Sequence, residues 1–170
     1  MKKFLIMLIS VLLSACSVSD EELRDQYMDY YHQNDGYVEQ YQKQTQNLSV
    51  QQLALQGAKK EKAKLHGQTH FYLGNGLYIE NVQADNNQVI FEYSFDKSSW
   101  SNLSKSAQDN MHASMNKDLI YRTCSLRTVK LAQEKGLEEH HRYYYDYPNK
   151  SLAFELTTSK QICLDNGFQR

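Results

Sequence analysis

Four segments in which apolar and polar residues alternate constrain the fold of this chain more than any other feature. The first two, LYIENVQ (77–83) and QVIFEYSFD (88–96), flank the sequence ADNN. A period of two places every second side chain on the same face of a strand, and Asn residues favour the turn between paired strands. The last two, LEEHHRYYYDY (137–147) and SLAFELTT (151–158), are joined by PNK, which suits a turn. The pattern predicts two β-hairpins.

The segment between the two hairpins changes to helical spacing. Five apolar residues recur there at every fourth position: Leu103, Ala107, Met111, Met115 and Leu119. This spacing predicts a helix over 101–124, and a shorter helix follows over 126–135. We therefore expect an α+β domain at 71–170. Its predicted architecture is an antiparallel sheet of four or five strands in the order ββααββ, with the helices packed on one face.

Residues 16–70 precede this domain and differ from it in composition. They are rich in Gln, Glu and Lys and show no strand-like alternation. Ser19 and Ser49 are followed three positions later by Glu22 and Gln52, the arrangement of a capping box at the start of a helix. The apolar stripes that follow are thin, so these helices have little surface to bury. We expect an N-terminal tether and a mobile helical arm.

The start of the chain has the pattern of an export signal. A basic start precedes an apolar core of about ten residues, which is too short to span a bilayer permanently. The sequence LSAC resembles the lipobox of bacterial lipoprotein signal peptides, so we expect residues 1–15 to be removed and Cys16 to carry a lipid anchor. An ordinary secretory signal or an uncleaved anchor is the alternative. By resemblance to the lipoprotein sorting rule, Ser17 directs the chain to the outer membrane, with its domain facing the periplasm.

Charge and cysteine content limit the classes of partner and site. The formal net charge is −1 and becomes more negative once Lys2 and Lys3 are removed, so no basic excess favours nucleic acid. With Cys16 lipidated, Cys124 and Cys163 remain, and an even pair in an exported chain predicts a disulfide. A metal pair or a redox pair is the alternative, without a second ligand cluster or a C-x-x-C spacing to support it.

The segment from Cys124 to Cys163 resembles the corresponding part of the β class of secretin pilotins, small lipoproteins of type II secretion. The parallels are a cysteine that ends a helix, a short TVKL helix at 128–131, Gly136 before a strand hairpin, and the closing cysteine. The resemblance implies an outer-membrane lipoprotein that captures the carboxy-terminal segment of a secretin subunit and guides secretin assembly. Capture would use an amphipathic helix in an apolar groove or a strand added to a sheet edge. It needs no cofactor.

The stretch EEHHRYYYDYP (138–148) is the candidate site in the sequence. His140 and His141 are neighbours on a predicted strand and so point to opposite faces, which argues against a shared metal ion. Two interpretations of the tyrosines are open. One is a two-faced strand with one tyrosine row against the helices, and the other is a partner-binding face made by Tyr143, Tyr145 and His141. No nucleophile elbow and no paired-acid constellation is recognisable, so we expect no enzyme.

Two further functions fit the same features. An accessory or protective lipoprotein of the cell envelope, such as an immunity or exclusion factor, would also combine a lipid anchor with a compact disulfide-bonded domain. A structural envelope protein would use its helical arm to reach the cell wall.

Overall fold

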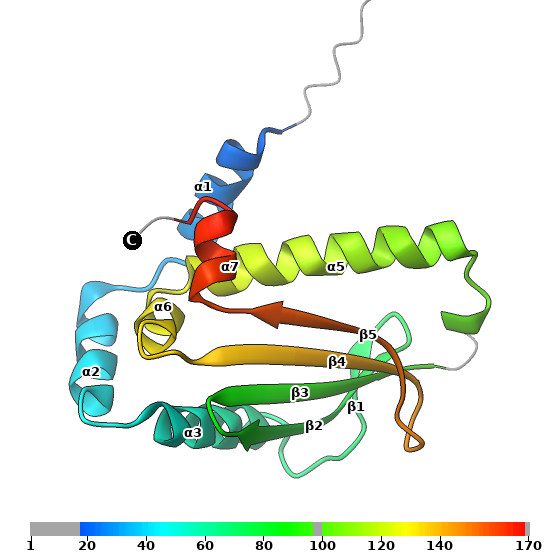
Figure 1. The fold of residues 1–170 in the computed structure, drawn as a ribbon, viewed down its shortest axis with the longest axis horizontal. Coiled ribbons are helices and arrows are strands. Elements are labelled where there is room, and N and C mark those ends of the chain that lie inside the picture. Colours follow the sequence, from blue (N-terminus) through cyan, green and yellow to red (C-terminus); the bar gives the residue numbers. More distant parts are fainter. Residues whose placement is uncertain (1–17, 97–99, 169–170) are drawn as a thin grey trace, which may run out of the picture.

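The computed structural model describes residues 18–96 and 100–168 of the chain. Its elements are α1 (Asp20–Tyr30), α2 (Asp35–Thr45), α3 (Val50–Ala63), β1 (Phe71–Gly74), β2 (Leu77–Asp85), β3 (Gln88–Phe95), α5 (Lys105–Ser125), α6 (Arg127–Gln133), β4 (Glu138–Asp146), β5 (Ser151–Thr158) and α7 (Lys160–Asp165). The strands form one sheet in the order β1-β2-β3-β4-β5, drawn in Figure 1 as a single layer. No helix in the described part of the chain is both long enough and apolar enough to cross a membrane.

Both predicted hairpins lie in the sheet. β2 and β3 pair in antiparallel orientation with Asp85 opposite Gln88, and Asn86 in the turn adopts a left-handed φ of 50°. β4 and β5 also pair in antiparallel orientation. β1 pairs with β2 and makes the fifth strand.

The centre of the sheet corrects the prediction of a purely antiparallel sheet. β3 and β4 run parallel, with Phe91 opposite His141 and Tyr93 opposite Tyr143. α5 and α6 lie between these strands in the chain, and a helical crossover of this kind lets a second strand run in the same direction as the first. The sheet is therefore mixed. The observed order also adds β1 before the predicted run and α7 after it, so the predicted ββααββ order is not confirmed.

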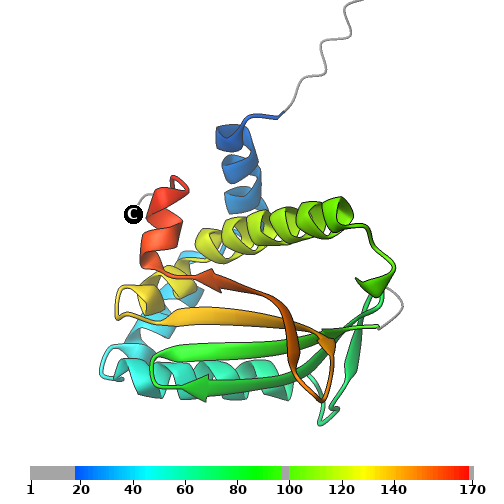
Figure 2. The same cartoon turned by 45° about the vertical axis from the view of Figure 1, so that its right-hand side comes forward.

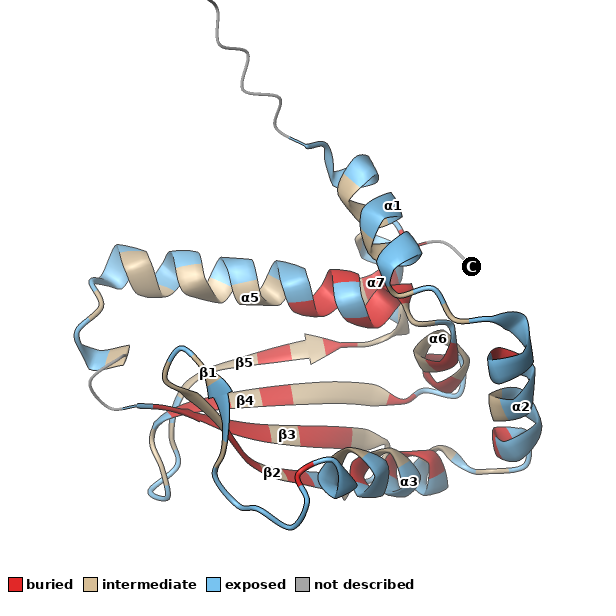
Figure 3. Cartoon of the chain, turned by 180° about the vertical axis from the view of Figure 1, so that it is seen from behind, coloured by how far each residue is buried: buried red, intermediate tan, exposed pale blue. Residues whose placement is uncertain are grey.

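α3 does not belong to a separate N-terminal arm. Leu53 and Ala54 are only 4% and 0% exposed, and both belong to the core that also contains side chains of the sheet, α5 and α6. A Cβ atom added to Gly57 would lie 3.2 Å from Val89 Cγ2, so the glycine that weakens an isolated helix permits close packing on β3 here. Figure 3 shows α3 running alongside β2.

α1 and α2 are also attached to the rest of the molecule. The Tyr27 hydroxyl in α1 donates to Asp118 Oδ1 in α5 at 2.7 Å. The Lys135 ammonium donates to three backbone carbonyls at and just beyond the C-terminal end of α2, at 2.7, 2.9 and 3.1 Å, where a helix favours positive charge. Figure 2 shows α1 against α5, on the side away from the sheet. The predicted mobile arm is thus not confirmed.

A disulfide joins the end of α5 to α7. It links Cys124 and Cys163, whose Cα atoms lie 5.5 Å apart. Both cysteines are buried in a second apolar cluster, in which the Phe168 ring meets the edge of Tyr121 at a centroid distance of 5.3 Å. The bridge therefore fixes the C-terminal helix to the centre of the domain.

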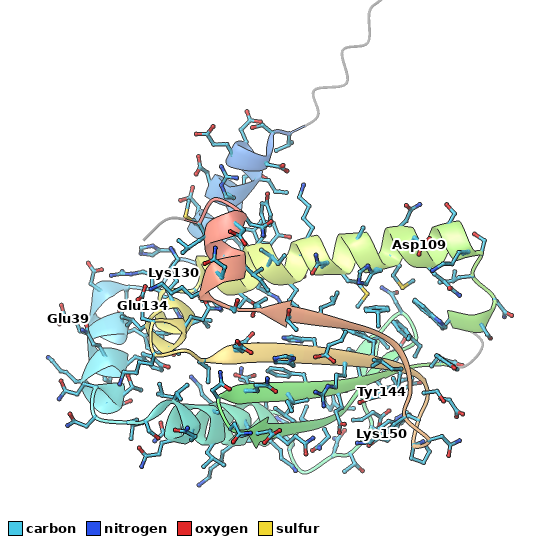
Figure 4. The ribbon with its side chains drawn as sticks, viewed as in Figure 1. Glu39, Asp109, Lys130, Glu134, Tyr144 and Lys150 are labelled. Atoms are coloured by element: carbon cyan, nitrogen blue, oxygen red, sulfur yellow. A yellow bond between two sulfur atoms is a disulfide. The ribbon has the colours of Figure 1, made fainter. Side chains whose placement is uncertain are left out.

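The face of β3 that points away from the core holds a buried carboxylate. Glu92 is 2% exposed and accepts hydrogen bonds from Lys150 at 2.6 Å, Asn81 at 3.2 Å and Tyr144 at 3.4 Å. Burial raises the pKa of Glu92, but the hydrogen bond from Lys150 and the other donors together hold it below the ordinary value of 4.5. Figure 4 shows Tyr144 and Lys150 near the turn between β4 and β5.

Candidate functional site

A groove of about 910 Å³ runs over the core face of the sheet. One wall comes from α2 and α3, and the other comes from the C-terminal end of α5 and from α6. Its floor is formed by Val89, Phe91 and Tyr93 of β3 and by His141 of β4. We refer to this site as the groove. Its size lies within the range of about 300–1,000 Å³ that is typical of ligand sites.

The floor rings of Phe91, Tyr93 and His141 belong to a row of stacked rings that follows from the parallel register and continues through Tyr143 and Phe154, which do not line the groove. Phe91 and His141 have ring centroids 4.5 Å apart at an interplanar angle of 8°, and Tyr93 and Tyr143 are 4.7 Å apart at 10°. Phe154 of β5 extends the row, 4.6 Å from Tyr143. Because each ring packs against its neighbour on the next strand, the floor is a preformed, largely apolar surface.

The three predicted partner-binding residues lie in different environments in the structure. His141 lines the groove. Tyr143 is 6% exposed and belongs to the stacked row. Tyr145 is 46% exposed, because shifts of register on both sides of Tyr144 end the regular alternation of β4. The structure thus brings His141 and Tyr143 together and leaves Tyr145 on the surface.

Burial keeps the floor and the adjoining ring of Tyr143 uncharged near neutral pH. It lowers the pKa of His141, an effect that the Glu139 carboxylate opposes in part. It also raises the pKa of Tyr143 to about 12 and shifts the pKa of Tyr93 upward. Charged groups line the groove around this floor, among them Lys60 of α3 and Arg122 of α5. The groove therefore combines an apolar floor with a mixed, partly basic rim.

The sequence does not predict the wall built by α2 and α3, because the thin apolar stripes of residues 16–70 indicate a mobile arm instead. Tyr41, Leu53 and Gly57 all line the groove. A signal was present, since Leu53, Ala54, Gly57 and Ala58 lie on one helical face and three of them are small enough for close approach to a sheet.

The adjacent histidines have separate environments. His140 contacts Glu155 at 2.5 Å and Glu138 at 3.2 Å, whereas His141 stacks on Phe91. Within residues 18–96 and 100–168, no group of three or more His, Cys, Asp or Glu residues is arranged to hold a metal ion. The predicted signal peptide, the lipidation residue Cys16 and the sorting residue Ser17 lie outside the described residues.

No protein-family model matches this chain, and no curated protein matches its sequence. Three solved structures are similar to it. A protein of Pseudomonas aeruginosa, named as a candidate secreted protein, is 13% identical with a TM-score of 0.48, over 67% of this chain and 96% of that one. The type II secretion pilotin EpsS of Vibrio vulnificus is 16% identical with a TM-score of 0.47, over 67% and 91% of the two chains. The type II secretion pilotin AspS of Vibrio cholerae is 13% identical with a TM-score of 0.47, over 67% and 92%.

Proposed function

We propose that this chain is a lipid-anchored binding protein of the bacterial envelope, without enzymatic activity. In this proposal it captures the carboxy-terminal segment of a secretin subunit and guides secretin assembly in the outer membrane. The observation that carries the proposal is the groove, an aromatic-floored site large enough for a peptide segment. The partner class comes from the sequence resemblance of residues 124–163.

The geometry of the groove favours a helical segment over an added strand. β3, which supplies most of the floor, is paired with β2 on one side and with β4 on the other. Its backbone hydrogen-bonding groups are therefore used, and a strand entering the groove would find none to pair with. The sheet has free edges at β1, which is only 4 residues long and contains a shift of register, and at β5, none of whose residues lines the groove. A helix satisfies its own backbone and can lay an apolar face on the rings.

A peptide-binding experiment tests the proposal directly. The probe is a synthetic peptide with the carboxy-terminal sequence of the secretin encoded in the same genome, measured by calorimetry. Val129 lines the groove on α6 and is half-buried, so Val129→Glu should weaken binding at least about tenfold, because it places a charge against the apolar face of the peptide. Leu55→Glu is the matched control, since Leu55 is 62% exposed on α3 and does not line the groove. Equal loss of affinity in both variants would contradict this site.

A cellular experiment tests the proposed role. Deleting the gene should leave secretin multimers outside the outer membrane, and the Cys16→Ser variant should fail to restore them because it lacks the site of lipidation. Normal placement of the multimers in the deletion strain would refute the role. A pull-down that recovers a toxin or a phage or conjugation component, and no secretin, would favour an immunity or exclusion factor instead.

A further inference from the structure

One polar atom on the groove floor has no hydrogen-bond partner. His141 is 4% exposed and stacks beside the rings of Phe91 and Tyr93, with centroid distances of 4.5 and 5.8 Å. Its Nδ1 atom is 3.1 Å from the Tyr93 hydroxyl, whereas its Nε2 atom is buried and makes no hydrogen bond. A buried polar atom without a partner carries a free-energy cost that a bound group can relieve.

The surroundings of His141 determine which of its two ring nitrogens carries the proton. Burial keeps the imidazole neutral and the Tyr93 phenol protonated. The buried hydroxyl needs an acceptor for its proton, and Nδ1 lies within reach. The neutral ring then carries its own proton on Nε2. His141 is thus assigned as a hydrogen-bond donor on the floor of the groove.

Glu139 lies beside this donor but does not accept a hydrogen bond from it. Its Oε2 atom is 3.6 Å from His141 Nε2, which is too long for a hydrogen bond. The Glu139 side chain is 18% exposed and also lines the groove, so its carboxylate is available to a group that approaches Nε2. Together the two residues present one donor and one acceptor within a site that is otherwise mostly apolar.

This pair selects among polar side chains. A hydroxyl or a carboxamide can accept from Nε2–H and donate to the carboxylate at the same time. A carboxylate can accept from the imidazole but is repelled by Glu139, and an ammonium can donate to Glu139 but cannot accept. An aliphatic side chain leaves both groups unpaired.

We infer that His141 and Glu139 recognise one Ser, Thr, Asn or Gln side chain within the apolar face of the helix that occupies the groove. The inference rests on the proposed function for the identity of the helix as a secretin segment, but not for its chemistry. A single buried polar position of this kind fixes the register of a helix against its partner, as it does in coiled coils.

The test uses the full chain and a panel of synthetic amphipathic helical peptides with a leucine face. The panel differs at one central position of that face, which carries Ala, Ser, Asn, Asp or Lys. The Ser and Asn peptides should bind the wild type about tenfold more tightly than the Ala, Asp and Lys peptides, as expected for one or two buried hydrogen bonds. Equal affinities across the panel, or no binding of any peptide, would overturn the inference.

Each variant is compared by the ratio of its affinities for two peptides of the panel, so that a general loss of stability does not resemble a loss of selectivity. His141→Phe keeps a ring beside Phe91 and should reduce the Ser-to-Ala ratio to about one. Glu139→Gln removes the repulsion and should raise the affinity of the Asp peptide relative to the Ser peptide about tenfold. Glu138→Gln is the control, because Glu138 contacts His140 instead, and it should leave every ratio unchanged. Persistence of the Ser preference in His141→Phe would refute the assignment.

The secretin peptide forms a separate arm of the same experiment. Its failure to bind, together with a clear preference in the panel, would reject the secretin as partner and support the recognition chemistry. Binding of the secretin peptide without any preference in the panel would support the secretin as partner and reject the recognition chemistry.

Discussion

Removing the disulfide should cost a large part of the stability of this domain. Replacing Cys124 and Cys163 by Ala opens a covalent loop with a sequence separation of 39 residues. The chain-entropy relation gives about 4 kcal/mol for a loop of this length. Domains of this size are typically stable by about 5–15 kcal/mol in total. Both cysteines are buried, so the Ala variant also leaves a small cavity, which adds to this cost.

Urea unfolding followed by circular dichroism measures this effect. With a slope of about 2 kcal/mol per molar urea, loss of the loop alone should lower the midpoint by about 2 M, and the cavity in the double Ala variant should lower it somewhat further. Wild-type protein treated with a reductant should shift by a similar amount, whereas the reductant should leave the double variant unchanged. All samples carry Cys16→Ser, so that no other thiol contributes. Unfolding of the reduced wild type at the oxidised midpoint would refute the loop-entropy reasoning.

Three further predictions test the fold. Leu53→Ala should lower the free energy of unfolding by about 2–5 kcal/mol because it opens a cavity in the shared core, whereas Leu55→Ala at the exposed position should change it by less than about 0.5 kcal/mol, both by urea titration. Lys135→Met should speed amide hydrogen exchange at the C-terminal end of α2, at a cost of about 1 kcal/mol, because three carbonyls lose their donor. The folded-state pKa of Glu92 is depressed, so its contribution to the free energy of unfolding is present above the ordinary value of 4.5 and is lost as the pH falls through the folded pKa. Lys150→Ala removes a group that lowers this pKa, so it should move the acid-unfolding midpoint to higher pH.

The local patterns of the sequence predict the strands well and their pairing poorly. The alternation of residues 88–96 and 151–158 places β3 and β5 within one residue of their observed ends. Alternation identifies which face a side chain takes, but it carries no information about which strand lies alongside or in which direction. The parallel pair β3–β4 could therefore not be predicted, and neither could the stacking of Phe91 on His141 that depends on it.

The shortness of β1 and α7 and the small side chains of α3 explain why the sequence does not predict the two short elements or the packing of α3. β1 has 4 residues and α7 has 6, and segments this short give too few periods for a pattern to be recognised. In α3 the buried stripe consists largely of small residues, which contribute little hydrophobicity to a sequence pattern. Its helix start at Ser49 was predicted correctly, and the capping box is present in the structure. Its role as a wall of the groove depends on tertiary packing, which the helix signals do not encode.

The parallel seam between β3 and β4 also dictates an order of assembly. Each flanking hairpin can form from residues close together in the chain, but the seam joins strands that are separated by the whole segment from Phe95 to Glu138. Contacts between distant segments carry the larger loop-closure cost and form late. Phe91 meets His141, and Tyr93 meets Tyr143, only across this seam. A chain in which this seam has not yet formed therefore lacks the floor, and the groove is complete only once β3 and β4 have paired.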